Sequence, residues 1–328
     1  MNYKVAIVIP ALNEEKFIDK CLNTVVEQTY PFRDMDVMVL DGGSTDKTKS
    51  IVNQWHDRFE NVRFLDNPGR IQSIAFNLGV KNSDAPYIIR LDAHVEYDPK
   101  YVELCLKHLQ EIENVGNVGG VCQMRPQRSG LIPEASAILN CSKFGIGGAT
   151  FRVGGDAGIV DTVPFGAFPR KVIEEIGGMR EDLARGEDNE FNSRIKKAGY
   201  KIYFDPKIES TYYARDTVRG CVKQMYANGV SIGRLLHIDR ESVGLRHLVP
   251  LAFVLSLIIC AIGAFFWKPL FWLLIVALGL YLLADMVATF VACKKHGFKF
   301  ILILPWLFFC VHVAYGWGTL MGIFGKKQ

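Results

Sequence analysis

Two patterns of hydrophobic positions divide this chain. Up to about residue 216, short apolar and β-branched runs alternate with segments in which apolar residues recur every three or four positions. Such runs predict buried strands and such spacing predicts amphipathic helices, so their alternation predicts an α/β fold built on a mainly parallel sheet. From residue 248 to residue 324 the chain is apolar almost throughout.

The first part is expected to hold four strands at its start, with helices between them. The strands are expected at residues 5–9, 36–40, 62–65 and 87–91, and the helices at residues 14–28, 46–55 and 70–80. Pro10 is expected to end the first strand. Residues 117–158 are rich in glycine and predict loops over a ligand cleft. Two further helices are expected at 170–176 and 187–198, and a strand at 201–204.

The apolar end of the chain contains segments long enough to cross a membrane. Residues 248–267, 270–293 and 300–324 each provide the roughly 20 apolar residues that a span requires. Buried core helices are the alternative, but these segments are apolar on every face and carry tryptophans near their ends. Three spans are therefore predicted, although Pro305 and His312 would also suit a third segment that is broken or re-entrant.

Basic residues flank these segments unevenly. Three arginines precede the first segment and three lysines follow the second. By the positive-inside rule this places the N-terminal part in the cytoplasm, and the protein is expected to be a multi-pass protein of the inner membrane. Lys326 and Lys327 fit this orientation less well if the third segment crosses. We thus expect a catalytic domain at 1–216, a juxtamembrane region at 217–247 and a membrane domain at 248–324. The helix expected at 217–237 suits either the membrane surface or a packed core.

Composition excludes several classes of protein. The formal net charge of +4 is too small to indicate nucleic-acid binding. The eight cysteines have no paired short spacing, which argues against a zinc site or a disulfide framework. The first apolar stretch is too short for a cleaved signal peptide. No Gly-x-Gly-x-x-Gly follows the first strand, so a nicotinamide-binding domain is not expected.

Polar residues stand where the expected strands end, which is where ligands bind to an open α/β sheet. Asp41 precedes Gly42 and Gly43, and a carboxylate in that position can accept hydrogen bonds from a nucleotide. The alternative is an ordinary turn, with Asp46 capping the next helix. Arg70 can bind a diphosphate, although a lone arginine is more often only solvated.

Two further carboxylate motifs suggest a metal and a base. Asp92 and His94 lie on one side of an extended segment, which suits a divalent ion that two phosphates already hold. Capping of a helix is a poor alternative for Asp92 because the next helix starts too far downstream. Glu187 and Asp188 open a helix, so they either interact favourably with its dipole or provide a general base.

Taken in order, these motifs resemble those of family 2 glycosyltransferases with a GT-A fold, most closely the succinoglycan-biosynthesis type with C-terminal membrane helices. The resemblance covers residues 5–206. It implies an inverting transfer of a sugar from a nucleotide-diphosphate donor, a UDP-sugar in the simplest case, to a lipid-linked or glycan acceptor in cell-surface or exopolysaccharide synthesis. It assigns the nucleotide to Pro10, Ala11, Asn13, Glu14 and Asp41, the divalent metal (Mg²⁺ or Mn²⁺) to Asp92 and His94, and catalysis to Glu187 and Asp188, the latter as base. Arg70 and Asp92 complete the expected nucleotide-sugar site.

Two departures from the family pattern affect these expectations. His94 stands where the family has a second aspartate, and as a softer ligand it favours Mn²⁺. The Gln-x-x-Arg-Trp motif of processive synthases is absent near Gln224, which indicates transfer of single sugars. A membrane scaffold with an inactive transferase domain is the alternative. A nucleotidyltransferase would need a glycine- and arginine-rich phosphate loop after the first strand, and residues 10–15 are not one.

Overall fold

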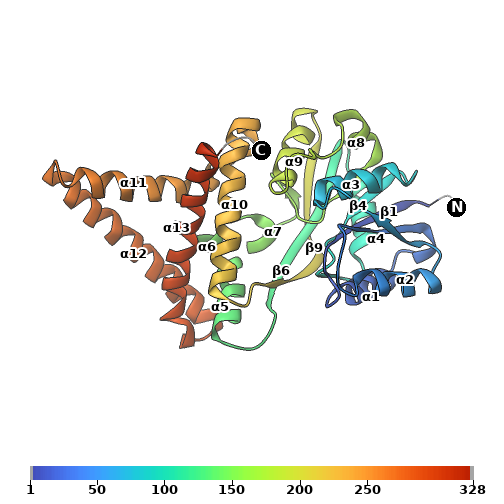
Figure 1. The fold of residues 1–328 in the computed structure, drawn as a ribbon, viewed down its shortest axis with the longest axis horizontal. Coiled ribbons are helices and arrows are strands. Elements are labelled where there is room, and N and C mark those ends of the chain that lie inside the picture. Colours follow the sequence, from blue (N-terminus) through green and yellow to red (C-terminus); the bar gives the residue numbers. More distant parts are fainter. Residues whose placement is uncertain (1–2, 326–328) are drawn as a thin grey trace. The chain divides into compact units, whose positions relative to one another are not determined.

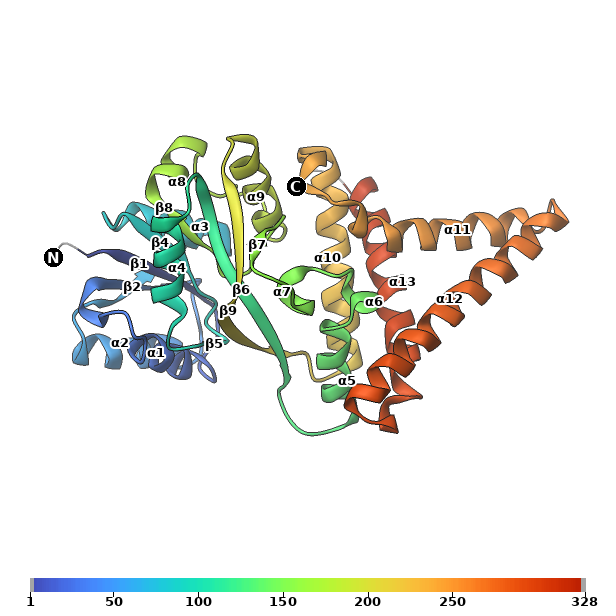
Figure 2. The ribbon, with the colours of Figure 1, turned by 180° about the vertical axis from the view of Figure 1, so that it is seen from behind.

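The computed structural model describes residues 3–325 and divides them into two compact units. One unit combines the chain up to residue 123 with residues 154–212, and it holds most of the sheet (Figure 1). The other combines residues 124–153 with the chain from residue 213 onward, and it is helical (Figure 2). That residues 1–216 act as a catalytic domain by themselves stays a prediction.

The sheet is parallel on one side and antiparallel on the other. In the described residues its strands follow the order β3-β2-β1-β4-β8-β6-β9-β5, and β7 pairs with β9. The parallel strands are β1 (Val5–Ala11), β2 (Met35–Asp41), β3 (Val62–Asp66) and β4 (Tyr87–Arg90). The others are β5 (Val95–Tyr97), β6 (Val115–Pro126), β7 (Gly158–Ile159), β8 (Ala167–Pro169) and β9 (Lys201–Ala214). The predicted strands at 5–9, 36–40, 62–65 and 87–91 are thus confirmed within one or two residues.

Pro10 does not end the first strand. It stays in β1, opposite Leu40 of β2, and the strand closes one residue later at Ala11. Proline suits the extended backbone, and at the end of a strand its missing N–H removes little from the ladder. Because β1 and β2 reach Ala11 and Asp41 together, their following loops start side by side.

The helices of this unit are α1 (Ile18–Val26), α2 (Thr48–Arg58), α3 (Gln72–Lys81), α4 (Tyr101–Glu111), α8 (Arg170–Ile176) and α9 (Glu187–Lys197). The first three begin later than predicted. The reason lies in the preceding loops, whose backbone groups bind side chains instead of forming helix. For example, the N–H of Glu14 donates to Oγ1 of Thr48 at 2.8 Å.

The expectation of irregular loops over residues 117–158 was wrong for much of the segment. It contains the long strand β6, then α5 (Leu131–Asn140), α6 (Lys143–Ile146) and α7 (Thr150–Val153). Gly120 lies inside β6, where an added Cβ would be 1.9 Å from the carbonyl oxygen of Ile208 in β9. Glycine here permits close approach of two backbones rather than a turn.

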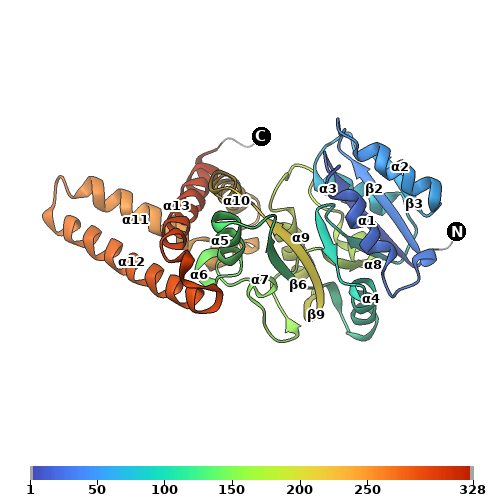
Figure 3. The same cartoon turned by 90° about the horizontal axis from the view of Figure 1, so that it is seen from below.

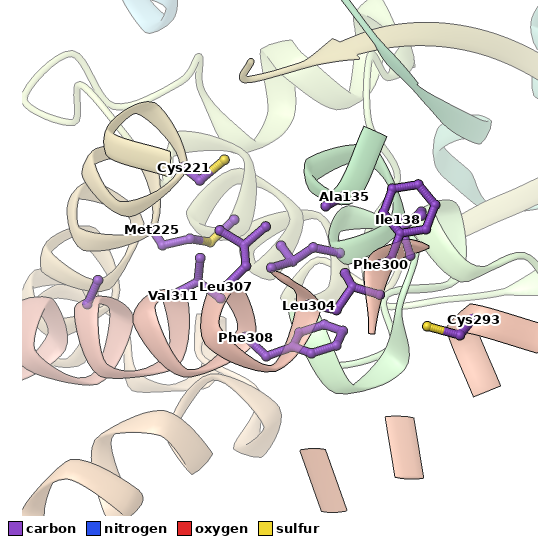
Figure 4. Close-up of a cluster of buried hydrophobic side chains, with 12 residues drawn as sticks. Ala135, Ile138, Cys221, Met225, Cys293, Phe300, Leu304, Leu307, Phe308 and Val311 are labelled. Carbon is purple, nitrogen blue, oxygen red and sulfur yellow. The ribbon is translucent and has the colours of Figure 1, made fainter. Parts of the chain in front are cut away.

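The helical unit is built around its last helix. It contains α10 (Val218–Ile238), α11 (Val249–Gly263), α12 (Lys268–His296) and α13 (Ile303–Phe324). Side chains of α5, α10 and α12 meet the same face of α13 in one hydrophobic cluster (Figure 4). The third apolar segment is therefore one continuous helix, and α10 packs against it instead of standing alone.

Three helices of this unit are long and apolar enough to cross a membrane. They cover Leu245–Gly263, Lys268–His296 and Ile303–Phe324. Their exposed surfaces differ, because only 6% of the most apolar window of α12 is buried within the protein, against 39% of that of α13. Helices that are apolar and exposed need lipid around them, so α12 is the strongest candidate for a span.

Candidate active site

Arg90 is a charged residue at the end of an otherwise apolar strand. It closes β4 and its side chain is only 5% exposed. A buried guanidinium requires several acceptors because its charge has lost water. Arg90 is not among the site residues predicted from the sequence, although an arginine directly after Ile88 and Ile89 in a buried run indicates that charged partners lie near it.

Those partners are three of the predicted site residues. Nη1 of Arg90 contacts Oδ1 of Asp188 at 2.5 Å and Oε1 of Glu187 at 3.5 Å. Nη2 donates to Oδ1 of Asp92 at 3.1 Å and to Oε1 of Gln72 at 3.3 Å. One arginine thereby brings together the predicted metal ligand and the predicted base, which lie on separate elements of the chain.

The four charged groups of this Arg90 cluster are not equally accessible. The side chains of Glu187 and Asp92 are 7% and 11% exposed, whereas that of Asp188 is 41% exposed. Asp188 is therefore the carboxylate that can meet a ligand from solvent while Arg90 fixes its position. Capping of α9 does not explain the position of Asp188, because the N-cap residue of that helix is Gly186.

Negative charge is in excess within this cluster, since three carboxylates face one guanidinium. Burial raises the pKa of Glu187 to about 7, and the neighbouring charge of Asp188 adds to this rise while Arg90 opposes it. The same carboxylates raise the pKa of Arg90 despite its burial, so the guanidinium stays charged. The remaining negative charge favours a cationic partner at this edge of the sheet.

Asp92 is held in place through its backbone as well. Its N–H donates to the phenol oxygen of Tyr97 at 2.7 Å, and Tyr97 is buried against Tyr101. This contact anchors the turn between β4 and β5. The carboxylate of Asp92 takes no part in this contact and accepts a hydrogen bond from Arg90.

His94 lies next to the loop that follows the first strand. Its Nδ1 is 3.0 Å from Oε1 of Glu14, and its ring lies 5.3 Å from that of Tyr212 in an edge arrangement. The structure thus joins Glu14, predicted for the nucleotide site, to His94, predicted for the metal. A carboxylate on one ring nitrogen fixes the orientation of an imidazole, as is common for histidines that bind metals.

Asp41 uses its carboxylate on its own loop. It accepts hydrogen bonds from the N–H groups of Gly43 and Ser44 at 3.0 and 2.8 Å, and from the Ser44 hydroxyl at 2.5 Å. Gly43 has a φ of 85°, which only glycine adopts without strain. This is the turn that was considered as the alternative, and Asp46 also binds the N–H of Thr48 at the start of α2.

Two more predicted nucleotide-site residues border the same loop. Asn13 has a φ of 56° and accepts a hydrogen bond from the N–H of Thr45 at 2.9 Å. Arg70 has a φ of 61°, and its Nη2 is 3.5 Å from the position of a Cβ on Gly43. Pro10 and Ala11 form the end of β1 beside it. The predicted nucleotide-site residues of the first two strands are thus neighbours in space, around one ordered loop.

A protein site for a divalent metal needs several ligand side chains close together. Between residues 3 and 325 no group of three or more His, Cys, Asp or Glu side chains is arranged to bind a metal ion. Asp92 and His94 provide a carboxylate and an imidazole, a donor pair that suits Mn²⁺ or Mg²⁺ only when other oxygens complete the coordination. These two donors would suit a metal that arrives with the phosphates of a donor, and that they hold one stays a prediction.

The first part of the chain matches a known protein family. The model described as "Glycosyl transferase family 2" matches residues 6–177, which is more than half of the chain. The matched range contains β1 to β4 and the loops around Asp41 and Asp92. It ends before α9, which carries Glu187 and Asp188.

Two curated relatives match over most of their length. A dolichyl N-acetyl-alpha-D-glucosaminyl phosphate 3-beta-D-2,3-diacetamido-2,3-dideoxy-beta-D-glucuronosyltransferase of Methanococcus voltae is 29% identical over 98% of both chains. The succinoglycan biosynthesis protein ExoA of Rhizobium meliloti is 32% identical over 75% of this chain and 74% of its own.

A solved structure shares the fold. The mannosyltransferase PcManGT of Pyrobaculum calidifontis, solved with GDP-Man and Mn²⁺, superposes with a TM-score of 0.63 at 18% identity, over 97% of this chain and 88% of its own. The fold predicted from the sequence, a GT-A fold with a mainly parallel sheet followed by apolar helices, is confirmed by this likeness and by the sheet order.

Proposed function

Since this chain belongs to glycosyl transferase family 2 and is a glycosyltransferase, we propose that it moves single sugars from a nucleotide-diphosphate donor to a lipid-linked acceptor, with inversion. The inverting mechanism accords with the family. The Arg90 cluster carries the proposal, because it presents one accessible carboxylate, Asp188, whose position is fixed by a buried guanidinium.

Asp188 is proposed as the general base. A hydroxyl is a weak nucleophile until a positioned carboxylate takes its proton as the new bond forms. Among the three carboxylates that face Arg90, Asp188 is the one that an acceptor hydroxyl can reach, while Glu187 is buried. Burial raises the pKa of both, and that of Glu187 to about 7. Glu187 therefore contributes to the electrostatics of the cluster, and Asp188 takes the proton.

The donor is proposed to bind along the ordered loop after β1 and β2. Asn13, Glu14, Asp41 and Arg70 border this loop, and Arg70 supplies the positive charge that a diphosphate requires. A divalent metal held by Asp92 and His94 would neutralise the leaving diphosphate. The solved relative with GDP-Man and Mn²⁺ supports this choice of donor chemistry. A UDP-sugar is our first candidate for the donor itself.

The acceptor is proposed to be a lipid-linked sugar at the cytoplasmic face of a membrane. The name of the Methanococcus voltae relative contains a dolichyl-linked sugar phosphate, and the Rhizobium meliloti relative takes part in succinoglycan synthesis. The apolar helices α11 and α12 would hold the chain in the membrane where such acceptors occur.

A direct test uses membranes that contain the protein. They are incubated with a panel of nucleotide sugars and a lipid extract, and labelled sugar in the lipid phase is measured. We expect one donor to be used, and Asp188→Asn to reduce transfer by roughly 10² to 10⁴. Asp182→Asn is the matched control, because Asp182 pairs with Arg180 outside the Arg90 cluster. Donor binding without any transfer by the unaltered protein would instead support the inactive scaffold.

A further inference from the structure

The last apolar helix contacts both arms of the helical hairpin that precedes it. α11 and α12 are joined by a short tip at residues 264–267, where Phe265, Phe266 and Trp267 are exposed. In Figures 1 and 3 this hairpin extends away from α10 and α13, which run beside each other. A hairpin of two apolar helices that crosses a membrane has both of its open ends on one side.

The two open ends of the hairpin meet α13 at different points along it. Near the start of α11, the carbonyl oxygen of Pro250 is 2.1 Å from the position of a Cβ on Gly316. Near the end of α12, Cys293 packs in the cluster with Leu304 (Figure 4). In a helix that rises 1.5 Å per residue, Leu304 and Gly316 are about 18 Å apart. α13 therefore connects the two open ends along one side of the membrane.

α10 lies beside α13 along its length. An added Cβ on Gly229 would be 2.1 Å from the carbonyl oxygen of Tyr315, and one on Gly322 would be 2.2 Å from that of Val230. At the far end, Nε2 of His237 lies 2.9 Å from the carbonyl oxygen of Ile323. Contacts this close fix the two helices as a pair, so both cross the membrane or neither does.

The exposed side chains of α10 decide between these two possibilities. Arg219, Lys223, Arg234 and His237 are exposed on this helix. A span with three permanent positive charges on its exposed surface is strongly disfavoured in hydrocarbon. At the surface of a bilayer with anionic lipids, the same side chains are favourable.

The exposed side chains of α13 are apolar and lie on one face. Its opposite face forms the hydrophobic cluster of the unit. Two of the exposed residues are tryptophans, which favour the level of the headgroups. The exposed residues recur at helical spacing and are Trp306, Phe309, Trp317 and Phe324, with Leu302 just before the helix. An apolar exposed face on α13 and basic exposed side chains on α10 are the two features expected of a helix pair in the membrane interface.

We propose that α11 and α12 cross the membrane, and that α10 and α13 lie in the membrane interface on the side where α11 begins, at Val249. The inference rests on the membrane attachment in the proposed function. Under it Phe324, at the end of α13, stays on the cytoplasmic side, where the positive-inside rule favours the charges of Lys326 and Lys327, which lie outside the described residues. It also places a basic helix at the depth of the phosphate groups of lipid-linked acceptors.

The test compares three positions that are similarly exposed. Leu245, Phe266 and Phe324 are 84%, 87% and 76% exposed, at the base of α11, at the tip and at the end of α13. Each is changed singly to cysteine in a chain that carries Cys141→Ser and Cys310→Ser, because the other six native cysteines are buried. Intact and permeabilised bacterial cells are then treated with a maleimide that cannot cross the inner membrane.

The pattern of labelling shows on which side of the membrane each of the three positions lies. We expect Phe266→Cys to react in intact cells, and Leu245→Cys and Phe324→Cys to react only after permeabilisation. Reaction of Phe324→Cys in intact cells would show that α13 crosses, and would overturn this inference while leaving the membrane anchor intact. If Phe266→Cys required permeabilisation as well as Leu245→Cys and Phe324→Cys, the hairpin would not cross, and both this inference and the anchoring of the chain by a crossing hairpin would fail.

Discussion

Arg90 determines the geometry of the site at the scale of single residues. Its guanidinium contacts Asp92 in the turn after β4 and Asp188 at the start of α9. The positions of these two carboxylates therefore depend on Arg90 as well as on their own elements. The arginine is buried and charged, and the carboxylates around it are the groups that make this acceptable.

Arg90→Lys tests this role in positioning. A single ammonium group cannot contact Asp188, Asp92 and Gln72 at the same time, so we expect kcat to fall about tenfold or more while the chain still folds. Arg180→Lys, in the exposed pair with Asp182, serves as the control. Kinetics with a fixed donor and acceptor give the answer, and an unchanged kcat for Arg90→Lys would show that the guanidinium geometry is not used.

Glu187 makes stability depend on pH. Burial raises its pKa from 4.5 in the unfolded chain to about 7, so the folded protein keeps a proton that the unfolded chain loses. Stability is therefore lost as the pH rises from about 4.5 to 7, by an amount on the order of 3 kcal/mol. Glu187→Gln should remove this loss and raise the melting temperature more at pH 8 than at pH 5. Thermal unfolding in detergent measures it, and an equal change at both pH values would contradict the prediction.

Metal dependence is tested at Asp92 and His94. Removal of divalent ions with EDTA should abolish transfer, and added Mn²⁺ or Mg²⁺ should restore it. His94→Asp replaces the imidazole with a harder ligand, so the ratio of activity in Mn²⁺ to activity in Mg²⁺ should fall relative to the unaltered protein. Transfer that persists in EDTA would remove the metal from the mechanism.

At the scale of elements, glycines in α10 and α13 allow the two helices to approach closely. Gly322→Ala adds a Cβ that would overlap the carbonyl oxygen of Val230, and we expect it to cost about 1 to 3 kcal/mol of stability. Gly279→Ala in α12 is the matched control, because a Cβ there has nothing within 4 Å. Melting temperatures of the two variants in the same detergent compare them directly. Similar values would mean that close packing does not hold the pair together.

The elements that the sequence predicted well are those with a strong local pattern. β1 to β4 are runs of buried residues, and their positions were found within one or two residues. β6 was missed because its glycines were interpreted as turns, and α5 because the glycine-rich pattern on both sides of it was interpreted as loops. In β6 these glycines permit contact with β9, a strand that lies far away in the sequence, so no local signal distinguished the two cases.

At the scale of the whole molecule, the proposed membrane attachment rests on apolar helices that a soluble transferase would bury. α11 and α12 expose apolar side chains along most of their length. We expect the full chain to stay in the membrane pellet after washes with high salt and with alkaline carbonate, and to be released only by detergent. Fractionation followed by immunoblotting measures this. Release by carbonate would indicate attachment at the surface without a crossing hairpin.

The sequence by itself determined the family, the mainly parallel sheet, the apolar segments and the carboxylates at the ends of strands, because each depends on neighbours in the chain or on a short motif. Tertiary structure decided which of these residues act together. Arg90 gathers Asp92, Glu187 and Asp188 across nearly a hundred residues, and no periodicity predicts such a contact. The packing of α13 was decided in the same way, since its contacts with α10 and α11 join residues that lie far apart in the chain.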